Sequence, residues 1–337
     1  MVDPALSLRR FLVAPDSFKG TFAAPQVAGA IARGVRSAGL GADECPVADG
    51  GEGTLDALLG ALGGEQVSVD AHDPLGRPVA AAYGVIEDGA TAIVEMARAS
   101  GLGLVAPAER DPWRADTRGT GELIVAAARR AGVRRILIAV GGSATVDGGA
   151  GALAAIAEAG GLHDAELVVL CDVQTPWERC AEVYGPQKGA DAAMVARLAQ
   201  RLDAQAATLA RDPRGMAMTG AAGGLAGGLW GALGAALEPG APYVLDVLGF
   251  DERLRNAACV ITGEGRIDEQ SAMGKIVGEI AARARRARVP AYAVVGCDDL
   301  GPERADALGL AAVVEATTLD ELAVAGEHLA RATAVRE

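Results

Sequence analysis

Residues 15–21, PDSFKGT, place Asp16, Ser17 and Lys19 directly after the short apolar run 11–14. The ammonium group of Lys19 suits a phosphoryl oxygen or a substrate carboxylate, although a lone loop lysine is usually solvated surface. Ligands of open α/β sheets bind beyond the carboxyl ends of the strands, where such polar residues collect. We therefore predict a catalytic role for Lys19 and substrate-binding roles for Asp16 and Ser17.

Two carboxylates lie three residues apart in the glycine-rich segment 49–54, DGGEGT. Asp49 and Glu52 either bind Mg²⁺ or substrate hydroxyl groups through their oxygen atoms, or belong to a capped helix start. We predict that Asp49 is catalytic and that Glu52 binds substrate.

Residues 263–275 bring together both signs of charge after the apolar run 259–262. Positioning and charge neutralisation dominate phosphoryl transfer, and this mixture fits that task, with a surface salt-bridge cluster as the alternative. The predicted catalytic residues are Arg266, Asp268 and Lys275, and the predicted substrate-binding residue is Glu264.

Residues 141–149, GGSATVDGG, follow the apolar run 135–140 and precede a helical pattern. Glycines let the backbone approach an anion, and hydroxyl groups add donors. The predicted cofactor-binding residues are Gly141, Gly142, Ser143, Thr145, Gly148 and Gly149. Asp147 either contacts a metal ion or caps the helix. No GxxxxGK[ST] occurs, so the loop is not a Walker A motif.

The rest of the chain alternates short apolar runs with helical patterns, which is typical of α/β proteins with parallel sheets. The predicted strands are 11–14, 92–95, 135–140, 167–170, 259–262 and 291–295, and Asp172 follows the fourth of them. The predicted helices include 121–131, 149–159, 194–209 and 275–286. Residues 67–94, with the turn 73–76, predict antiparallel hairpins. Segments 117–122 and 187–189 are weaker polar candidates, compatible with a helix cap and a turn.

Composition excludes several classes of protein. A net charge of −13 opposes binding to nucleic acid or to anionic membranes. Five scattered cysteines without a CxxC pair predict reduced thiols, and three dispersed histidines argue against a histidine-based zinc site. The glycine-rich run 219–237 is a poor membrane span. No convincing targeting segment is present, so we expect a cytoplasmic protein.

Taken together, the polar blocks resemble the bacterial glycerate kinase family, the type that includes glycerate 2-kinases. The matching stretches, in the order of the family, are PDSFKGT (15–21), ADGGEGT (48–54), TRGTGELI (117–124), GGSATVDGG (141–149), CDV (171–173), GPQKGA (185–190), TGAAGGL (219–225) and ITGEGRIDEQSAMGK (261–275). The resemblance covers nearly the whole chain. The chain departs from the family in a short 158–166 segment, in Val146, and at residues 174–181, which bear on substrate preference more than on reaction class.

The resemblance implies a flavodoxin-like parallel-sheet domain, residues 1–66 and 250–337, with a second α/β domain, residues 67–249, inserted into it and the active site in the cleft between. It also implies ATP, Mg²⁺ and D-glycerate, with 2-phospho-D-glycerate as product. Asp147 or Asp172 is the expected metal ligand, and Asp49 or Asp268 the expected partner of the reacting hydroxyl group. Lys19, Arg266 and Lys275 would share the substrate carboxylate and the transferring phosphoryl group.

The sequence is also compatible with other functions. The acceptor could be another small sugar acid, or the product 3-phosphoglycerate, since both hydroxyl groups require similar residues. A non-catalytic sensor of a hydroxy acid or nucleotide is the rival from another class, and the sequence leaves the oligomeric state undetermined.

Overall fold

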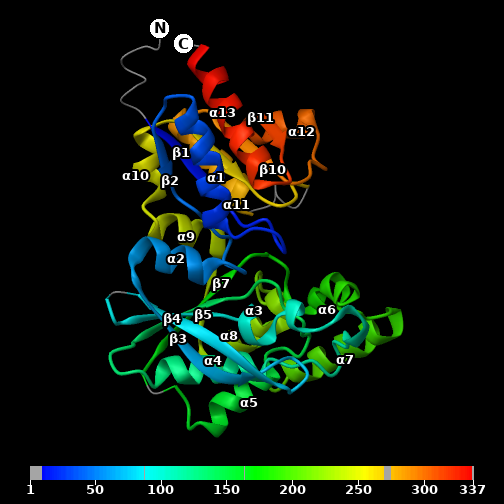
Figure 1. Ribbon diagram of the computed structural model, residues 1–337. Helices are drawn as coiled ribbons and strands as arrows, with labels where there is room; N and C mark the ends of the chain where they lie inside the picture. The colour runs from blue at the N-terminus through cyan, green and yellow to red at the C-terminus, as the bar shows by residue number, and fades with distance from the viewer. Residues whose placement is uncertain (1–9, 87, 163, 269–274, 336–337) are drawn as a thin grey trace. The chain divides into compact units, whose positions relative to one another are not determined.

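The computed structural model describes residues 10–86, 88–162, 164–268 and 275–335. The described chain forms two compact units, each with its own sheet: unit 1 within Met1–Asp49 and Ala241–Glu337, and unit 2 within Gly50–Gly240 (Figure 1). The predicted α/β class with two sheets is confirmed. The units part at Asp49/Gly50 and Gly240/Ala241, and the domain boundaries expected at 66/67 and 249/250 stay a prediction.

Unit 1 is built on a parallel sheet of five strands in the order β11-β10-β9-β1-β2. Its strands are β1 (Arg10–Pro15), β2 (Ala42–Glu44), β9 (Ala257–Gly263), β10 (Ala291–Val295) and β11 (Leu310–Glu315). Its helices are α1 (Ala24–Ser37), α9 (Gly240–Val247), α10 (Phe250–Arg255), α11 (Ile276–Ala287), α12 (Pro302–Leu308) and α13 (Leu319–Val335). With unit 2 inserted after the second strand, this is the strand order of flavodoxin-like folds.

Side-chain alternation along the strands divides the core of unit 1 between the two faces of the sheet. Phe11 and Val13 of β1 pack with α1 and α13, whereas Leu12 and Ala14 pack with α9, α10 and α11. Helix α1 shows how sequence dictates this packing. Pro25 lies in its first turn, and Val27, Ile31 and Val35 are buried along one face, as the four-residue spacing predicts.

Unit 2 contains a mixed sheet of six strands in the order β3-β4-β5-β6-β7-β8, antiparallel from β3 to β5 and parallel beyond. Its strands are β3 (Gly64–His72), β4 (Pro78–Ile86), β5 (Thr91–Glu95), β6 (Arg135–Ala139), β7 (Glu166–Cys171) and β8 (Ala236–Pro239). Its α-helices are α2 (Thr54–Leu62), α3 (Ala97–Ser100), α4 (Arg118–Ala128), α5 (Ala150–Glu158), α6 (Cys180–Tyr184), α7 (Ala192–Ala206) and α8 (Leu225–Leu233). Its short 3₁₀ turns are η2 (Leu102–Leu104), η3 (Pro107–Glu109), η4 (Trp177–Arg179), η5 (Pro186–Lys188) and η6 (Ala221–Gly224).

The main core of unit 2 joins the sheet to α4, α5 and α8 through small aliphatic side chains. A second, smaller core lies under α6 and α7 around Trp177, which is fully buried. The predicted hairpin at residues 67–94 is confirmed by the antiparallel pair β3 and β4, joined through the turn that Asp73 begins. Within the described residues, no helix is both long and apolar enough to cross a membrane.

Candidate active site

Asp16 and Glu264 leave unit 1's sheet at neighbouring points because β1 and β9 are parallel and in register. Pro15 pairs with Gly263, and the Asp16 N–H donates to the Gly263 carbonyl at 2.8 Å. The segment after β2 continues beside β1 and carries the buried Asp49 to the same edge of the sheet. Three carboxylates, those of Asp16, Asp49 and Glu264, thus lie near the carboxyl ends of the strands, as the motifs lead us to expect.

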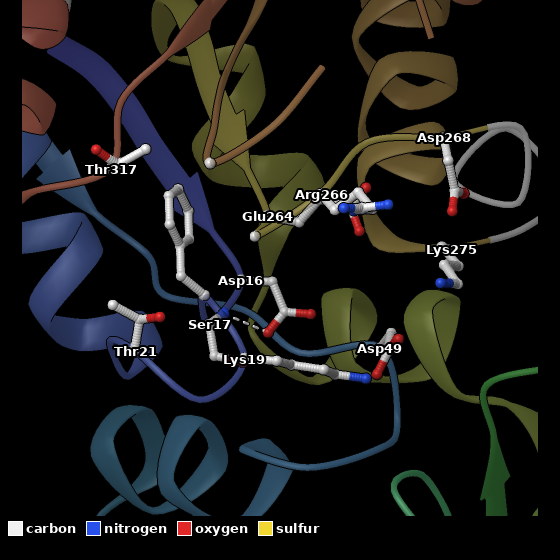
Figure 2. A pocket seen from close by; sticks show the side chains of 13 residues that line it. Asp16, Ser17, Lys19, Thr21, Asp49, Glu264, Arg266, Asp268, Lys275 and Thr317 are labelled. Atoms are coloured by element: carbon white, nitrogen blue, oxygen red, sulfur yellow. Dashed lines mark hydrogen bonds between the residues drawn. The ribbon is translucent and has the colours of Figure 1, made fainter. Parts of the chain in front are cut away.

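These residues line a cavity of about 470 Å³ within unit 1 (Figure 2). Its charged lining residues are Asp16, Lys19, Asp49, Glu264, Arg266, Asp268 and Lys275, joined by Ser17, Thr21 and Thr317 among others. The Lys19 side chain extends toward Asp49 in Figure 2. Every site residue predicted on the blocks 15–21 and 263–275 therefore lines one pocket together with Asp49. Residues 269–274, none of which was a predicted site residue, lie outside the described part of the chain.

The carboxyl group of Asp16 is strongly perturbed by its surroundings in this pocket. Its side chain is 6% exposed, and its Oδ1 accepts a hydrogen bond from the Ser17 N–H at 2.6 Å. Burial raises the pKa of Asp16 well above its ordinary value, and the negative charge of Asp49 raises it further. The Ser17 N–H and the Lys19 ammonium group oppose this rise. Carboxyl groups with shifted pKa values gather at functional sites.

The rim of the pocket is more exposed than its floor. The Arg266 guanidinium pairs with Asp299 at 2.9 Å, and the Arg266 side chain is 65% exposed. Lys275 is half-buried and immediately precedes α11. Gly296 lets the segments at residues 265 and 296 approach closely, because a Cβ there would stand 2.5 Å from the Gly265 carbonyl oxygen. The Arg266 guanidinium at this rim is therefore open to the solvent, from which a small anion would arrive.

Residues 141–149 form a tightly supported loop after β6 in unit 2. The Leu102 N–H donates to Gly142 O, and the Ala144 N–H donates to Ser100 O, at 2.8 and 3.0 Å. The N–H groups of Gly142 and Ser143 donate to no acceptor among the described residues. A turn whose neighbouring N–H groups stay available is a geometry suited to an anion.

Asp147 is engaged by hydrogen bonds from the protein itself. Its Oδ2 accepts from the Thr117 N–H at 3.0 Å, the Thr117 hydroxyl at 2.8 Å and the Gly151 N–H at 3.0 Å, while Oδ1 accepts from the Gly149 N–H at 3.2 Å. This geometry fits the helix-capping alternative better than a metal ligand. The metal role of Asp147 stays a prediction.

The hydroxyl groups of the loop are less available than the sequence suggested. Thr145 is fully buried, and its Oγ1 has no hydrogen-bond partner among the described residues. Ser143 Oγ accepts a hydrogen bond from the Lys188 ammonium at 2.7 Å. The buried Gly148 donates its N–H to Gly223 O at 3.0 Å. Of the predicted phosphate contacts, those at Gly142 and Ser143 therefore have the more available backbone donors.

Glu52 and Asp172, the remaining predicted residues, lie beside the start of this loop. A Cβ on Gly141 would stand 3.3 Å from Asp172 Oδ2, and a Cβ on Gly142 would stand 3.4 Å from Glu52 Oε2. Glu52 is exposed and Asp172 is half-buried. Unit 2 thus has its own polar cluster, formed by the loop and these two carboxylates.

Two buried charged residues near this cluster were not among the predicted site residues. Glu95, at the end of β5, accepts hydrogen bonds from the Gly53 and Leu55 N–H groups, at 3.0 and 3.2 Å, and so fixes the segment that carries Glu52. Lys188 lies beneath the glycine loop. A carboxylate at the very end of an apolar run is the signal that would have identified Glu95.

Comparisons with known proteins return one consistent group. The model of the Glycerate kinase family matches residues 11–159 and 158–334. A "Glycerate kinase" of Bacillus subtilis (strain 168) is 40% identical over 327 residues, covering 85% of both chains, and a "Glycerate 2-kinase" of Escherichia coli (strain K12) is 37% identical over 331 residues, covering 87% of both. The crystal structure of a "putative glycerate kinase 2" from Salmonella typhimurium LT2 is similar with a TM-score of 0.81 and 35% identity, covering 97% of this chain and 99% of that one.

Proposed function

The chain belongs to the glycerate kinase family, and from this membership we propose that it transfers the γ-phosphoryl group of ATP to D-glycerate, forming 2-phospho-D-glycerate and ADP. The family predicted from the motifs is confirmed, and with it the reaction class, a kinase that phosphorylates an alcohol group. The choice of the C2 hydroxyl group and the use of Mg²⁺ belong to the proposal, as does the cytoplasmic location.

One observation carries the assignment of the acceptor: the pocket of unit 1 gathers Lys19 with the buried Asp16 and Asp49. Glycerate is a small anion with two hydroxyl groups, so its recognition needs a cation and hydrogen-bond acceptors more than an apolar surface. A cavity of about 470 Å³ lined in this way suits such a molecule. We assign Lys19 and the rim cations Arg266 and Lys275 to the substrate carboxylate and the phosphoryl oxygens.

In the proposed reaction, the glycerate hydroxyl oxygen forms a bond to the γ-phosphorus of ATP. The bond from that phosphorus to the β–γ bridging oxygen breaks, and its electron pair leaves with ADP. The hydroxyl proton passes to a carboxylate, for which Asp49 and Asp268 are the candidates. Alignment and charge neutralisation contribute more than base strength when the transition state is loose.

Magnesium, when bound with the nucleotide, neutralises charge on the phosphate oxygens. Mg²⁺ keeps several waters and needs only one or two protein carboxylates. The described residues contain no group of three or more His, Cys, Asp or Glu side chains that could hold a metal ion by themselves. Asp147 and Asp172 are the candidate ligands, and a metal ion at Asp147 would compete with the four hydrogen bonds that its oxygens accept.

Phosphorus NMR of the purified protein with ATP, Mg²⁺ and D-glycerate tests the proposal directly. The expected result is a 2-phosphoglycerate signal that grows with ADP. A 3-phosphoglycerate signal would overturn the choice of hydroxyl group while keeping the kinase. ATP left unchanged by a folded sample would favour another sugar acid or the sensor.

Lys19→Met tests the pocket. Removing a cation that acts in the transition state should lower kcat/KM for glycerate about 100-fold or more. Arg36→Met is the matched control, because Arg36 is a half-exposed cation of the same unit that pairs with Glu44 and does not line the pocket. Equal activity of both variants would place the acceptor elsewhere.

A further inference from the structure

Lysine is rare in this chain, and its three positions are informative. Of 31 basic residues, only Lys19, Lys188 and Lys275 are lysines, and the others are arginines. Lys19 and Lys275 line the pocket of unit 1. Lysine carries a compact ammonium group with three donors, whereas arginine carries a planar guanidinium fork, so the two side chains are not interchangeable. Lys188 is the one lysine to which the proposed function assigns no role.

Lys188 is buried at the end of η5, with only 2% of the residue exposed. Its Nζ lies 2.7 Å from Ser143 Oγ and 2.7 Å from the Thr145 carbonyl oxygen, and 5.9 Å from the centre of the Tyr184 ring. All three of these partners are uncharged. The ammonium group therefore connects two residues of the glycine loop and forms no ion pair with any described residue.

A buried ammonium group without an ion pair is unfavourable unless an anion balances it. Burial lowers the pKa of Lys188 to about 8, while Cys180, Asp147 and Asp172 oppose this shift from beyond hydrogen-bonding distance. Burial also raises the pKa of the Cys180 thiol to about 12, so that sulfur is neutral near pH 8 and provides no full charge. Lys188 is thus mostly protonated at pH 7, with its charge only partly compensated.

The glycine loop that Lys188 contacts offers hydrogen-bond donors for an anion. The N–H groups of Gly142 and Ser143 have no acceptor among the described residues, and Gly142 is exposed. Two backbone donors in the loop and a buried positive charge in contact with the loop favour the same ligand, a phosphate group.

We propose that Lys188 is a positioning residue for nucleotide phosphate: it fixes the loop through Ser143 and Thr145 and stabilises, through that loop, a phosphate group held at Gly142 and Ser143. The inference rests on the proposed assignment of this loop to ATP. Lys188 acts through the loop rather than by contact with the reacting atoms.

Calorimetric titration with ADP and with adenosine tests this role in the full-length protein. Lys188→Met should weaken ADP binding about 10- to 100-fold, the range expected for loss of a charge-assisted interaction. Adenosine carries no phosphate, so its affinity should stay within about twofold. Equal weakening for both ligands would mean that the variant merely damages the fold, and unchanged ADP affinity would mean that the phosphate does not sense Lys188. Either result overturns the inference.

A second measurement needs no variant at position 188. Protein labelled with ¹³C at the lysine ε carbons has only three lysine side chains to resolve, and Lys19→Met and Lys275→Met leave the Lys188 signal to be assigned by elimination. ADP should raise the pKa of Lys188, and ADP affinity should fall as the pH rises past 8. An unchanged pKa in saturating ADP would refute the role of Lys188 alone. Failure of the wild-type protein to bind ADP at all would instead refute the proposed function, and this inference with it.

Discussion

Glu95 provides the clearest link between burial, charge and pH in this protein. Its side chain is 4% exposed, its Oε2 accepts hydrogen bonds from the Gly53 and Leu55 N–H groups, and the Arg98 Nε lies 3.9 Å from its Oε1. Burial raises the pKa of Glu95 to about 7, against the lowering effects of Arg98 and the two N–H groups. We predict that Glu95→Gln stabilises unit 2, and that it does so increasingly as the pH rises.

The sign follows from proton linkage. A carboxyl group with a raised pKa binds its proton more tightly in the folded state, so it stabilises the fold most at low pH and loses this contribution between pH 4.5 and 7. A shift from 4.5 to about 7 corresponds to about 3 kcal/mol at full ionisation. Glutamine resembles the protonated acid and does not titrate. The variant should therefore be more stable by about 1 kcal/mol at pH 5.5 and about 3 kcal/mol at pH 8.5.

Urea unfolding followed by tryptophan fluorescence measures this difference in the right part of the molecule, because Trp113, Trp177 and Trp230 all lie in unit 2. Glu182→Gln is the matched control, since its side chain is 66% exposed and its surface ion pair contributes little. The control should differ from the wild type by less than about 0.5 kcal/mol at both pH values. A Glu95→Gln difference that is the same at pH 5.5 and 8.5 would refute the raised pKa.

Two glycine substitutions should have opposite effects in the same fluorescence assay. Gly223→Ala should destabilise unit 2 by about 3 kcal/mol or more, because Gly223 has φ +64° and an added Cβ would overlap the Thr145 carbonyl oxygen. An unchanged unfolding midpoint would contradict the packing described for η6. Gly60→Ala should stabilise by about 0.5–1 kcal/mol, because Gly60 lies within α2 and an added Cβ would meet no atom within 4 Å; a loss of stability would show an unrecognised contact.

The strands that sequence reasoning missed share one property. β2 and β11 are the two edges of the sheet in unit 1, and β8 is an edge of the sheet in unit 2. An edge strand pairs on one side only and is partly exposed, so charged residues can interrupt its apolar residues, as they do in β2 (ADE) and β8 (ALEP). β11 (LAAVVE) carries an apolar run as continuous as that of the central strand β10, so its edge position does not account for its being missed. β3 is also an edge, but the turn at Asp73 and the alternation beyond it made that hairpin predictable.

The positions of the candidate site residues were predictable where those residues follow the end of a strand. They were not predictable where they depend on packing between distant parts of the chain. Asp16 and Glu264 directly follow predicted strands, and register alone brings them together. The hydrogen bonds from Thr117 to Asp147 join residues 30 positions apart, and nothing local in the loop indicates them. The burial of Lys188 likewise depends on contacts with Ser143 and Thr145, more than 40 positions away.

Residues 174–181, where the sequence departs from the pattern of the family, contribute Trp177 to the smaller core of unit 2. Trp177 donates its N–H to Thr219 Oγ1 at 2.9 Å and its indole Nε1–H to Leu202 O at 3.1 Å. Its ring lies so close to two glycines that a Cβ on Gly148 or Gly224 would stand 2.6 or 3.0 Å from it.

A phosphate-binding loop is effective when its donors are fixed before the ligand arrives. Trp177 fills the space beside these glycines and so supports the glycine loop. The unusual 174–181 segment contacts the support of the proposed nucleotide loop. We therefore expect substitutions in this segment to change nucleotide affinity.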